Sequence, residues 1–163
     1  MSMEKLGYAA TCLLGACLLF TSCAPAQDAK NETKLTLTSL PAPVRKTAEE
    51  QRKGAQIRSI EKELHEGNSV YEVAMTVNGR TRDIIIAADG ALLIAEQEMT
   101  LAELPAPVRA TLEENAGKAK ILLIESVAQR DSLAYYEAQV SASGERSEIK
   151  VSPAGDLIPQ ERK

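Results

Sequence analysis

The hexapeptide Leu40-Pro41-Ala42-Pro43-Val44-Arg45 recurs without change as Leu104-Pro105-Ala106-Pro107-Val108-Arg109. The identity continues downstream of both copies in the same order, in the pairs Ile57 and Ile121, Glu61 and Glu125, Tyr71 and Tyr136, Gly79 and Gly144, and Gly90 and Gly155. An ordered match of this length indicates an internal duplication, with each copy forming one structural unit.

Each copy carries the signals of one short helix followed by four strands. Proline is tolerated in the first helical turn, so helices are expected over Pro43–Lys53 and Pro107–Asn115, each followed by a glycine that ends it. Asn78-Gly79 is a strong two-residue hairpin signal. The expected strands cover residues 56–64, 70–77, 80–87 and 91–95 in the first copy and 120–128, 134–141, 146–151 and 156–158 in the second.

The predicted fold class is therefore α+β, with two αββββ repeats forming an antiparallel sheet and the helices packed on one face. The first repeat is assigned to residues 37–98 and the second to residues 99–160, with residues 96–100 as a short connection. Each copy is too small to bury much surface by itself, so the two are expected to share one hydrophobic core and unfold together.

Strand alternation assigns the side chains to two faces. Tyr71, Val73 and Met75, with their counterparts in the second copy, are expected to pack under the helices. The other face is expected to be open and polar, as antiparallel sheets allow. Ile85 and Tyr135 are apolar exceptions on that face. The candidate partner-binding residues on this face are Ile85, Tyr135, Glu72, Glu137 and Gln139.

The N-terminus predicts export. Residues 1–22 read as a signal peptide, because their apolar run is too short to span a bilayer permanently. Thr21-Ser22-Cys23 resembles the lipobox of bacterial lipoproteins, which makes Cys23 the candidate lipidation site and residues 23–36 a tether. Two alternatives stay open: lipidation at Cys17, after Leu14-Gly15-Ala16, and ordinary signal cleavage near residues 24–26.

Composition excludes several classes of function. The net charge is −4 and aromatic residues are 3% of the chain, which argues against nucleic-acid binding. All three cysteines lie at or before Cys23, so a folded domain beyond it has no disulfide, thiolate nucleophile or cysteine zinc site. His65 is the single histidine and is expected in a solvated loop, which leaves no basis for a catalytic triad, a bound metal or a cofactor.

The motif order resembles that of PepSY and PepSY-like domains. The residues that carry the resemblance are Leu40–Val44, Gly54-Ala55 with Ile57 and Ile60-Glu61, Tyr71-Glu72-Val73 and Asp89-Gly90, with most of them repeated in the second copy. Ala154 departs from the pattern at the position of Asp89. The resemblance implies an envelope-bound module, and tandem copies also look like beta-lactamase-inhibitor-type proteins, whose joined sheets bind through one surface. It supplies no catalytic residues.

Three functions follow from these observations. The first is a non-enzymatic lipoprotein, anchored on the periplasmic or surface side of a bacterial membrane, that binds a protein or peptide through the open sheet face as an inhibitor-like module. The second is a structural envelope component. The third is an enzyme of unrecognised type, which the missing nucleophile–base pair disfavours.

We expect lipidation at Cys23. The intact mass of membrane-extracted protein should correspond to a chain that starts at residue 23 and carries added acyl chains, because two or more chains are needed for stable anchoring. Cys23→Ser should abolish lipidation and Cys17→Ser should not. A mature chain that begins at residue 17, 18 or 24 would contradict this assignment.

Overall fold

The computed structural model describes residues 35–65, 67–130 and 132–159. The predicted signal peptide, Cys17 and Cys23 lie outside these residues, and so does all of the predicted tether except Leu35 and Thr36. Among the described helices, none has the length and apolar composition needed to cross a bilayer.

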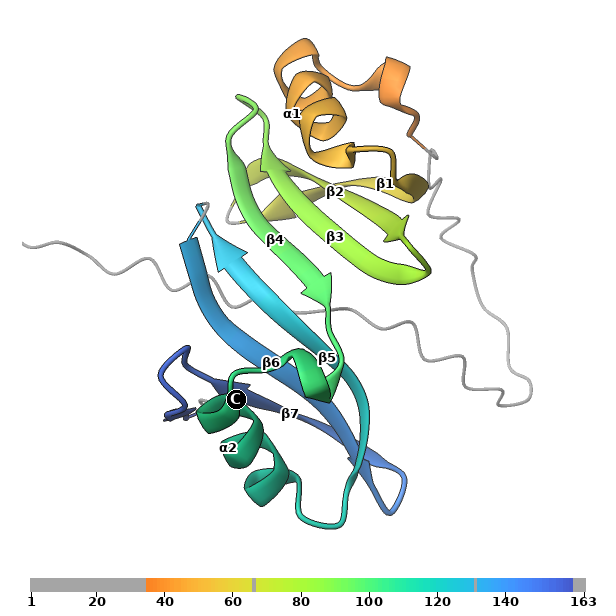
Figure 1. Ribbon diagram of the computed structural model, residues 1–163. Coiled ribbons are helices and arrows are strands. Elements are labelled where there is room, and N and C mark those ends of the chain that lie inside the picture. Colours follow the sequence, from red (N-terminus) through yellow and green to blue (C-terminus); the bar gives the residue numbers. More distant parts are fainter. Residues whose placement is uncertain (1–34, 66, 131, 160–163) are drawn as a thin grey trace, which may run out of the picture. The chain divides into compact units, whose positions relative to one another are not determined.

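The chain forms an eight-stranded antiparallel sheet and two α-helices, which confirms the predicted α+β class (Figure 1). The strands are hydrogen-bonded in chain order, from β1 at one edge to β8 at the other. The elements of the first half are η1 (Leu37–Ser39), α1 (Ala42–Arg52), β1 (Gln56–His65), β2 (Asn68–Val77), β3 (Arg80–Ala87) and β4 (Leu92–Glu98). Those of the second half are η2 (Leu101–Glu103), α2 (Ala106–Ala116), β5 (Lys120–Gln129), β6 (Ser132–Ala142), β7 (Glu145–Val151) and β8 (Leu157–Ile158).

A close contact between the helix start and a distant glycine turn explains why the proline motif and the glycine recur together. A Cβ atom on Gly90, whose φ is +91°, would lie 2.8 Å from the carbonyl oxygen of Pro43. The Thr47 hydroxyl donates to the Gly90 carbonyl at 2.6 Å. The second half has the same contact, since a Cβ on Gly155 would lie 2.7 Å from Cβ of Pro107. Only glycine combines this backbone angle with this approach.

The hydrophobic core consists of two clusters, so the expectation of one shared core was wrong. In the first, Val44 and Ala48 of α1 pack with Val73, Met75 and Ile84 of β2 and β3. The second has the same construction, with Val108 and Leu112 of α2 packed against Tyr136, Ala138, Val140, Ile149 and Val151. Each helix has its own strands, because a sheet of eight strands is too wide for one short helix to reach both halves.

Both clusters lie on the same face of the sheet. Ile84 of the first cluster lies opposite Ala95, and Gln97, two residues further along β4, lies opposite Ser126. Ser126 in turn lies opposite Tyr136 of the second cluster. Directly opposed residues of antiparallel strands point to the same side, as do residues two apart in one strand. The helices therefore cover one face, and the other face carries no described helix.

The expected connection between the halves is mostly strand. β4 continues through Glu98 and pairs with β5, with Glu96 opposite Val127 and Glu98 opposite Glu125. Thr100 lies in the short segment between β4 and η2. β4 extends to Glu98 because its edge would otherwise leave backbone donors and acceptors unpaired, and pairing with β5 satisfies them. The two halves consequently form one continuous sheet.

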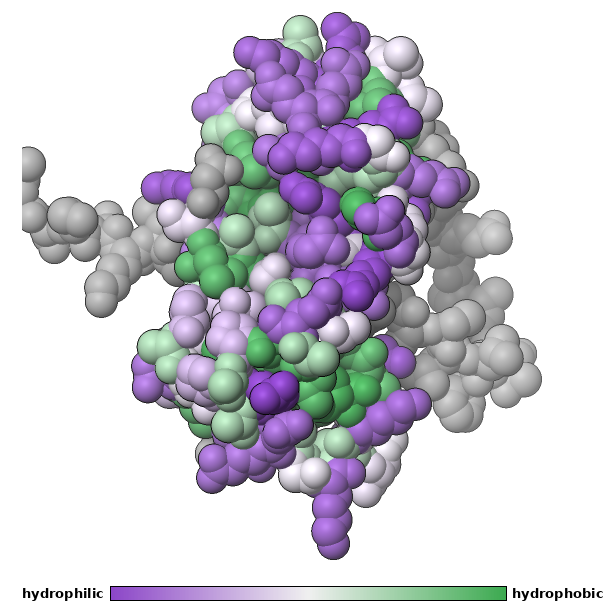
Figure 2. All heavy atoms as spheres, in the orientation of Figure 1, coloured by the Kyte–Doolittle hydropathy of each residue, from purple (hydrophilic) through white to green (hydrophobic). Residues whose placement is uncertain are grey.

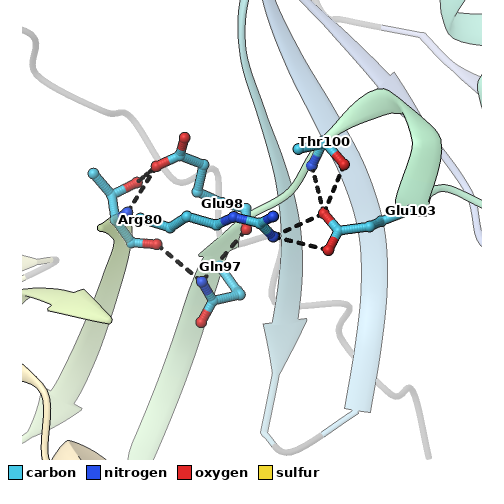
Figure 3. A network of polar contacts seen from close by, with 6 residues as sticks. Arg80, Gln97, Glu98, Thr100 and Glu103 are labelled. Atoms are coloured by element: carbon cyan, nitrogen blue, oxygen red, sulfur yellow. Dashed lines mark hydrogen bonds and ion pairs between the residues drawn. The ribbon is translucent and has the colours of Figure 1, made fainter. Parts of the chain in front are cut away.

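Side chains near the end of β4 add a second connection (Figure 3). The Arg80 guanidinium at the start of β3 donates two hydrogen bonds to the Glu103 carboxylate of η2, at 2.8 and 2.9 Å. The Thr100 backbone N–H and hydroxyl both donate to the same carboxylate, at 2.8 Å each. These bonds, with the Arg80 hydrogen bond as the largest contribution, lower the pKa of Glu103 to about 2. The network fixes η2 against the first half of the sheet.

The surface drawn in Figure 2 is mainly hydrophilic around α1, and hydrophobic residues gather in smaller patches between hydrophilic ones. Among the described residues, the most exposed large hydrophobic side chain is Leu64 near the end of β1, at 75% exposure. Scattered exposed aliphatic residues of this kind are normal on soluble proteins.

We expect Met75→Ala to lower the free energy of unfolding by about 2–5 kcal/mol, because Met75 is fully buried and its loss leaves a cavity. Val140→Ala, in the second cluster, should also destabilise the chain. Leu64→Ala is the matched control and should change stability by less than about 0.5 kcal/mol. Urea unfolding of the full chain measures all three. Equal effects of Met75→Ala and Leu64→Ala would contradict the assigned core.

Candidate functional site

The face of the sheet opposite the helices is the candidate site. We call it the helix-free face and define it by residues whose side chains point to that side according to the strand register: Glu72, Asp83, Ile85, Ile94, Glu96, Glu98, Glu125, Val127, Tyr135, Glu137, Gln139 and Lys150. It extends across β2 to β7, because pairing of β4 with β5 makes the sheet continuous.

All five candidate residues from the sequence lie on this face. Glu72 and Ile85 are opposite each other on β2 and β3, and both are half-buried. Tyr135, Glu137 and Gln139 alternate along β6 and are buried, with exposures of 9%, 6% and 7%. The expectation of an open, solvated face was therefore wrong for the β6 residues, which lie in the middle of the second half between β5 and β7.

Tyr135 belongs to a row of side chains that crosses the seam between the halves, which is the pairing of β4 with β5. The row runs over successive strands, with each residue opposite the next: Asp83, Glu96, Val127 and Tyr135. The ammonium nitrogen of Lys150 lies 5.0 Å from the centre of the Tyr135 ring, a cation–π distance. Burial raises the pKa of Tyr135, and the positive charge of Lys150 opposes that rise. The ring is thus held in place from β7.

A second row brings three carboxylates together. Glu98, Glu125 and Glu137 lie directly opposite one another on β4, β5 and β6, and Lys150 continues the row on β7. Lys150 Nζ lies 3.0 Å from Glu137 Oε2. Burial raises the pKa of Glu137, while the hydrogen bond from Lys150 acts in the opposite direction. Like charges directly opposite each other destabilise a sheet, so this row costs folding free energy.

Glu96 of β4 and Glu125 of β5 flank the seam and are almost fully buried, with exposures of 8% and 5%. Burial, followed by the charges of Glu125 and Glu137, raises the pKa of Glu96 to about 8. Burial, followed by the charge of Glu137, raises the pKa of Glu125 to about 7. Both carboxyls therefore change charge near neutral pH, where an ordinary glutamate is already ionised.

Sequence reasoning missed both of these glutamates. The sequence predicts that Glu96 lies in the connection between the repeats, and it shows Glu125 only as one half of a repeated pair with Glu61. Strand alternation could have placed Glu125 on the helix-free face. Residues two positions apart in a strand point to the same side, so Glu125 shares a face with Val127. For Glu96 the local sequence holds no comparable signal, since its position depends on the pairing of β4 with β5.

The first half of the face has its own ion pair. Arg58 Nη2 donates to Asp83 Oδ1 at 2.8 Å, and Arg58 Nε donates to the Met75 carbonyl at 3.2 Å. Burial raises the pKa of Glu72, and the charges of Glu63 and Asp83 raise it further. The face as a whole therefore holds more acceptors than donors, an arrangement suited to receiving positively charged groups.

Two features bear on metal binding and acid–base chemistry in the part of the chain that the structure describes. Within residues 35–65, 67–130 and 132–159, no group of three histidine, cysteine, aspartate or glutamate side chains is arranged to hold a metal ion. A pocket of about 410 Å³ lies between Leu35–Leu37 and the start of β1, with Arg52 and Arg58 at its wall. Its lining has no histidine or carboxylate that could act as a base.

Comparison with known proteins shows the fold. No family model matches the chain, and no curated protein sequence matches it either. Solved structures do match: a Bacteroides eggerthii protein described as periplasmic has a TM-score of 0.63 at 17% identity, over 75% of this chain and 88% of that one.

Two further structures give the same result. A DUF2874 family protein from Bacteroides ovatus has a TM-score of 0.60 at 15% identity, over 74% of this chain and 86% of that one. A BLIP-like protein from Bacteroides fragilis has a TM-score of 0.59 at 16% identity, over 75% and 85%. At this level of identity the likeness establishes a shared BLIP-like fold.

We expect Glu96→Gln to stabilise the protein more at high pH than at low pH. The folded state binds the Glu96 proton more tightly than the unfolded state, so stability is lost as pH rises from about 4.5 through about 8. Glutamine cannot ionise and so removes this loss. Relative to the unsubstituted chain, the free energy of unfolding of Glu96→Gln should be higher at about pH 9 than at about pH 5, by on the order of 2 kcal/mol. Thermal unfolding at both pH values measures the difference.

The exposed residue Glu114 of α2 provides the matched control. Glu114→Gln should change the free energy of unfolding by less than about 0.5 kcal/mol. If Glu96→Gln changed the unfolding free energy equally at both pH values, the assigned burial of the Glu96 carboxyl would be wrong.

Proposed function

We propose that this chain is an exported, lipid-anchored, non-enzymatic protein that binds a protein or peptide partner in the cell envelope through the helix-free face. One observation carries the proposal: Glu98, Glu125 and Glu137 are directly opposed on three paired strands. An arrangement that costs stability is typical of functional sites, where it is retained for binding rather than for folding.

The geometry of the face supports binding of a protein or peptide more than binding of a small molecule. Its residues extend over six strands that join both halves of the sheet. Ile85 and Ile94 provide apolar contact surface beside the acidic groups, and they lie opposite each other on β3 and β4. A mixture of apolar and charged side chains on one continuous surface is typical of protein interfaces.

Export and anchoring rest on the N-terminal sequence. Residues 1–22 have the signal-peptide pattern, and Cys23 follows a lipobox-like segment. The Bacteroides eggerthii protein that shares the fold is described as periplasmic, which supports the same side of the membrane for this chain.

The two αββββ repeats of the PepSY-like type are part of the same proposal. The repeated motifs support them, and so does the order of elements, in which a helix and four strands occur twice. In this proposal the duplication doubles the width of the binding face.

An inhibitor-like role is the form of binding that the fold favours, because a BLIP-like protein shares this architecture. The partner in that case is a peptidase or another envelope enzyme. A structural envelope component is the second candidate, and inhibition assays of the purified chain against envelope peptidases distinguish the two. An enzyme is the third, favoured only by the near-neutral pKa values of Glu96 and Glu125.

We expect a photo-crosslinker placed at Ile85 to capture a partner in cells. Ile85 is half-buried on the helix-free face, so a modest substitution there preserves the fold. The matched control is Leu64, an exposed aliphatic residue of β1 whose register places it on the opposite face. With the crosslinker at position 85, one protein adduct should form reproducibly. With the crosslinker at position 64, that adduct should be absent. Mass spectrometry identifies the adducts.

The substitution Ile85→Ser should weaken capture of that partner by at least about tenfold, which is 1.4 kcal/mol, while Leu64→Ser leaves it unchanged. Tyr135 is unsuited to this test because its burial makes loss of stability the expected result. Equal adducts from positions 85 and 64, or no effect of Ile85→Ser, would exclude the helix-free face as the binding surface.

A further inference from the structure

We propose that the free edge of β1 binds an extended segment of a partner protein as an additional strand of the sheet, and that this segment alternates basic with apolar residues. The stretch of β1 that pairs with it is residues 59–63. This edge is a second interaction surface beside the helix-free face, so the inference goes beyond the proposed function and does not depend on it.

The backbone of β1 provides the first observation. β1 has ten residues and is hydrogen-bonded to β2 alone. Every second residue of an antiparallel strand directs its N–H and C=O away from the partner strand, so the outer edge of β1 offers a row of backbone donors and acceptors. Among the described residues, no backbone hydrogen bond from outside the sheet reaches this row. β8, the opposite edge, has only two residues, which leaves β1 as the edge long enough to add a strand.

The register of β1 defines the stretch that pairs. A bulge separates Ile57 from Ser59, and beyond it residues 59–65 pair with β2 without interruption. A regular stretch of this kind is a template for a further strand, whereas a bulge disturbs the ladder.

A pocket at the same edge provides the second observation. Its volume is about 410 Å³, and its apolar lining consists of Leu35, Leu37, Ile57 and Ile60. Ile60 lies opposite Val73 of the first core cluster, so it points to the helix-covered side. A residue of the added strand opposite Ile60 points to that side as well, toward the pocket. Segments that join a sheet edge gain affinity from backbone hydrogen bonds and specificity from such pockets, which here favour an apolar side chain.

The other side of the edge selects basic residues at the alternate positions. Glu61 lies opposite Glu72, so Glu61 and Glu63 both point to the helix-free side, where they are exposed. Neither forms an ion pair with another described residue, and the neighbouring cation Arg58 already pairs with Asp83 at 2.8 Å. Burial, followed by the charges of neighbouring carboxylates that include Glu63 and Glu61, raises the pKa of Glu72. Lysine or arginine directly opposite Glu61 and Glu63 would therefore stabilise the added strand.

The same charges argue against a second copy of this chain as the occupant. Two copies joined by antiparallel β1 strands place each strand opposite its own reverse. A register centred on Lys62 opposes Lys62 to itself and Glu61 to Glu63, and a register centred on either glutamate opposes that glutamate to its own copy. Like charges directly opposite each other destabilise a sheet, and charged edges are a common protection against self-pairing. The complementary strand therefore comes from a different protein.

The first test uses the full chain purified in detergent and a fluorescein-labelled peptide of alternating lysine and valine. A matched peptide has glutamate in place of lysine. Fluorescence anisotropy should show at least about tenfold weaker binding of the glutamate peptide. The double variant Glu61→Lys, Glu63→Lys should weaken binding of the lysine peptide by at least about the same factor.

The matched control is the double variant Glu113→Lys, Glu114→Lys, which makes the same change of charge at two exposed positions of α2. It should leave the affinity unchanged at an ionic strength of about 0.15 M, where charges more than about 8 Å away are largely screened.

The second test examines the backbone pairing. Two lysine–valine peptides are methylated on the backbone nitrogens of alternate residues, one on the lysines and the other on the valines. Only one of these sets directs its N–H groups toward β1, so one methylated peptide should bind at least about tenfold more weakly than the other. Hydrogen exchange measured by NMR should slow for amides within residues 59–63 when the unmethylated peptide is added.

Four results would overturn the proposal: no binding of the lysine peptide or equal binding of the lysine and glutamate peptides, equal binding of the two methylated peptides, an unaltered affinity in Glu61→Lys, Glu63→Lys, or unchanged exchange within residues 59–63. Slow exchange there without peptide, increasing with protein concentration, would identify a second copy as the occupant and would also contradict it. The helix-free face would stand in each case if position 85 still captured its partner.

Discussion

The antiparallel pairing of β4 with β5 is the constraint on which the rest of the structure depends. It converts two helix-and-sheet halves, each with its own hydrophobic cluster, into one sheet of eight strands. It also places Glu96 and Glu98 of the first half beside Val127 and Glu125 of the second. Without this pairing Glu96 and Glu125 would lie on separate sheet edges, where water would solvate their carboxylates and remove the burial that raises their pKa values.

Much of the fold follows from local signals. The proline motif and the distant glycine recur together because they touch, as Pro43 with Gly90 and Pro107 with Gly155 show. Strand alternation placed Tyr71, Val73 and Met75 under the helix, since a period of two leaves little freedom once one residue is buried. The same alternation placed Ile85, Tyr135, Glu72, Glu137 and Gln139 on the opposite face.

The candidate site was less accessible to sequence reasoning, because it depends on neighbours that are distant along the chain. Glu96 looked like part of a polar connection, and only the pairing partner of β4 shows it to be a buried strand residue. Tyr135 looked like an exposed anchor, yet it is buried and lies beside Lys150. Alternation gives the direction of a side chain, whereas its exposure depends on what the adjacent strands place next to it.

The pairing of β4 with β5 buries the carboxyls of Glu96 and Glu125 at the boundary between the two halves of the sheet. The most direct measurement is a pH titration of the glutamate side-chain carboxyl carbons by NMR. We expect Glu96 to titrate near pH 8 and Glu125 near pH 7, and we expect the titration of Glu96 to shift to lower pH when Glu125 is replaced by glutamine. Titration of both carboxyls near their usual value of 4.5, independently of each other, would contradict this burial.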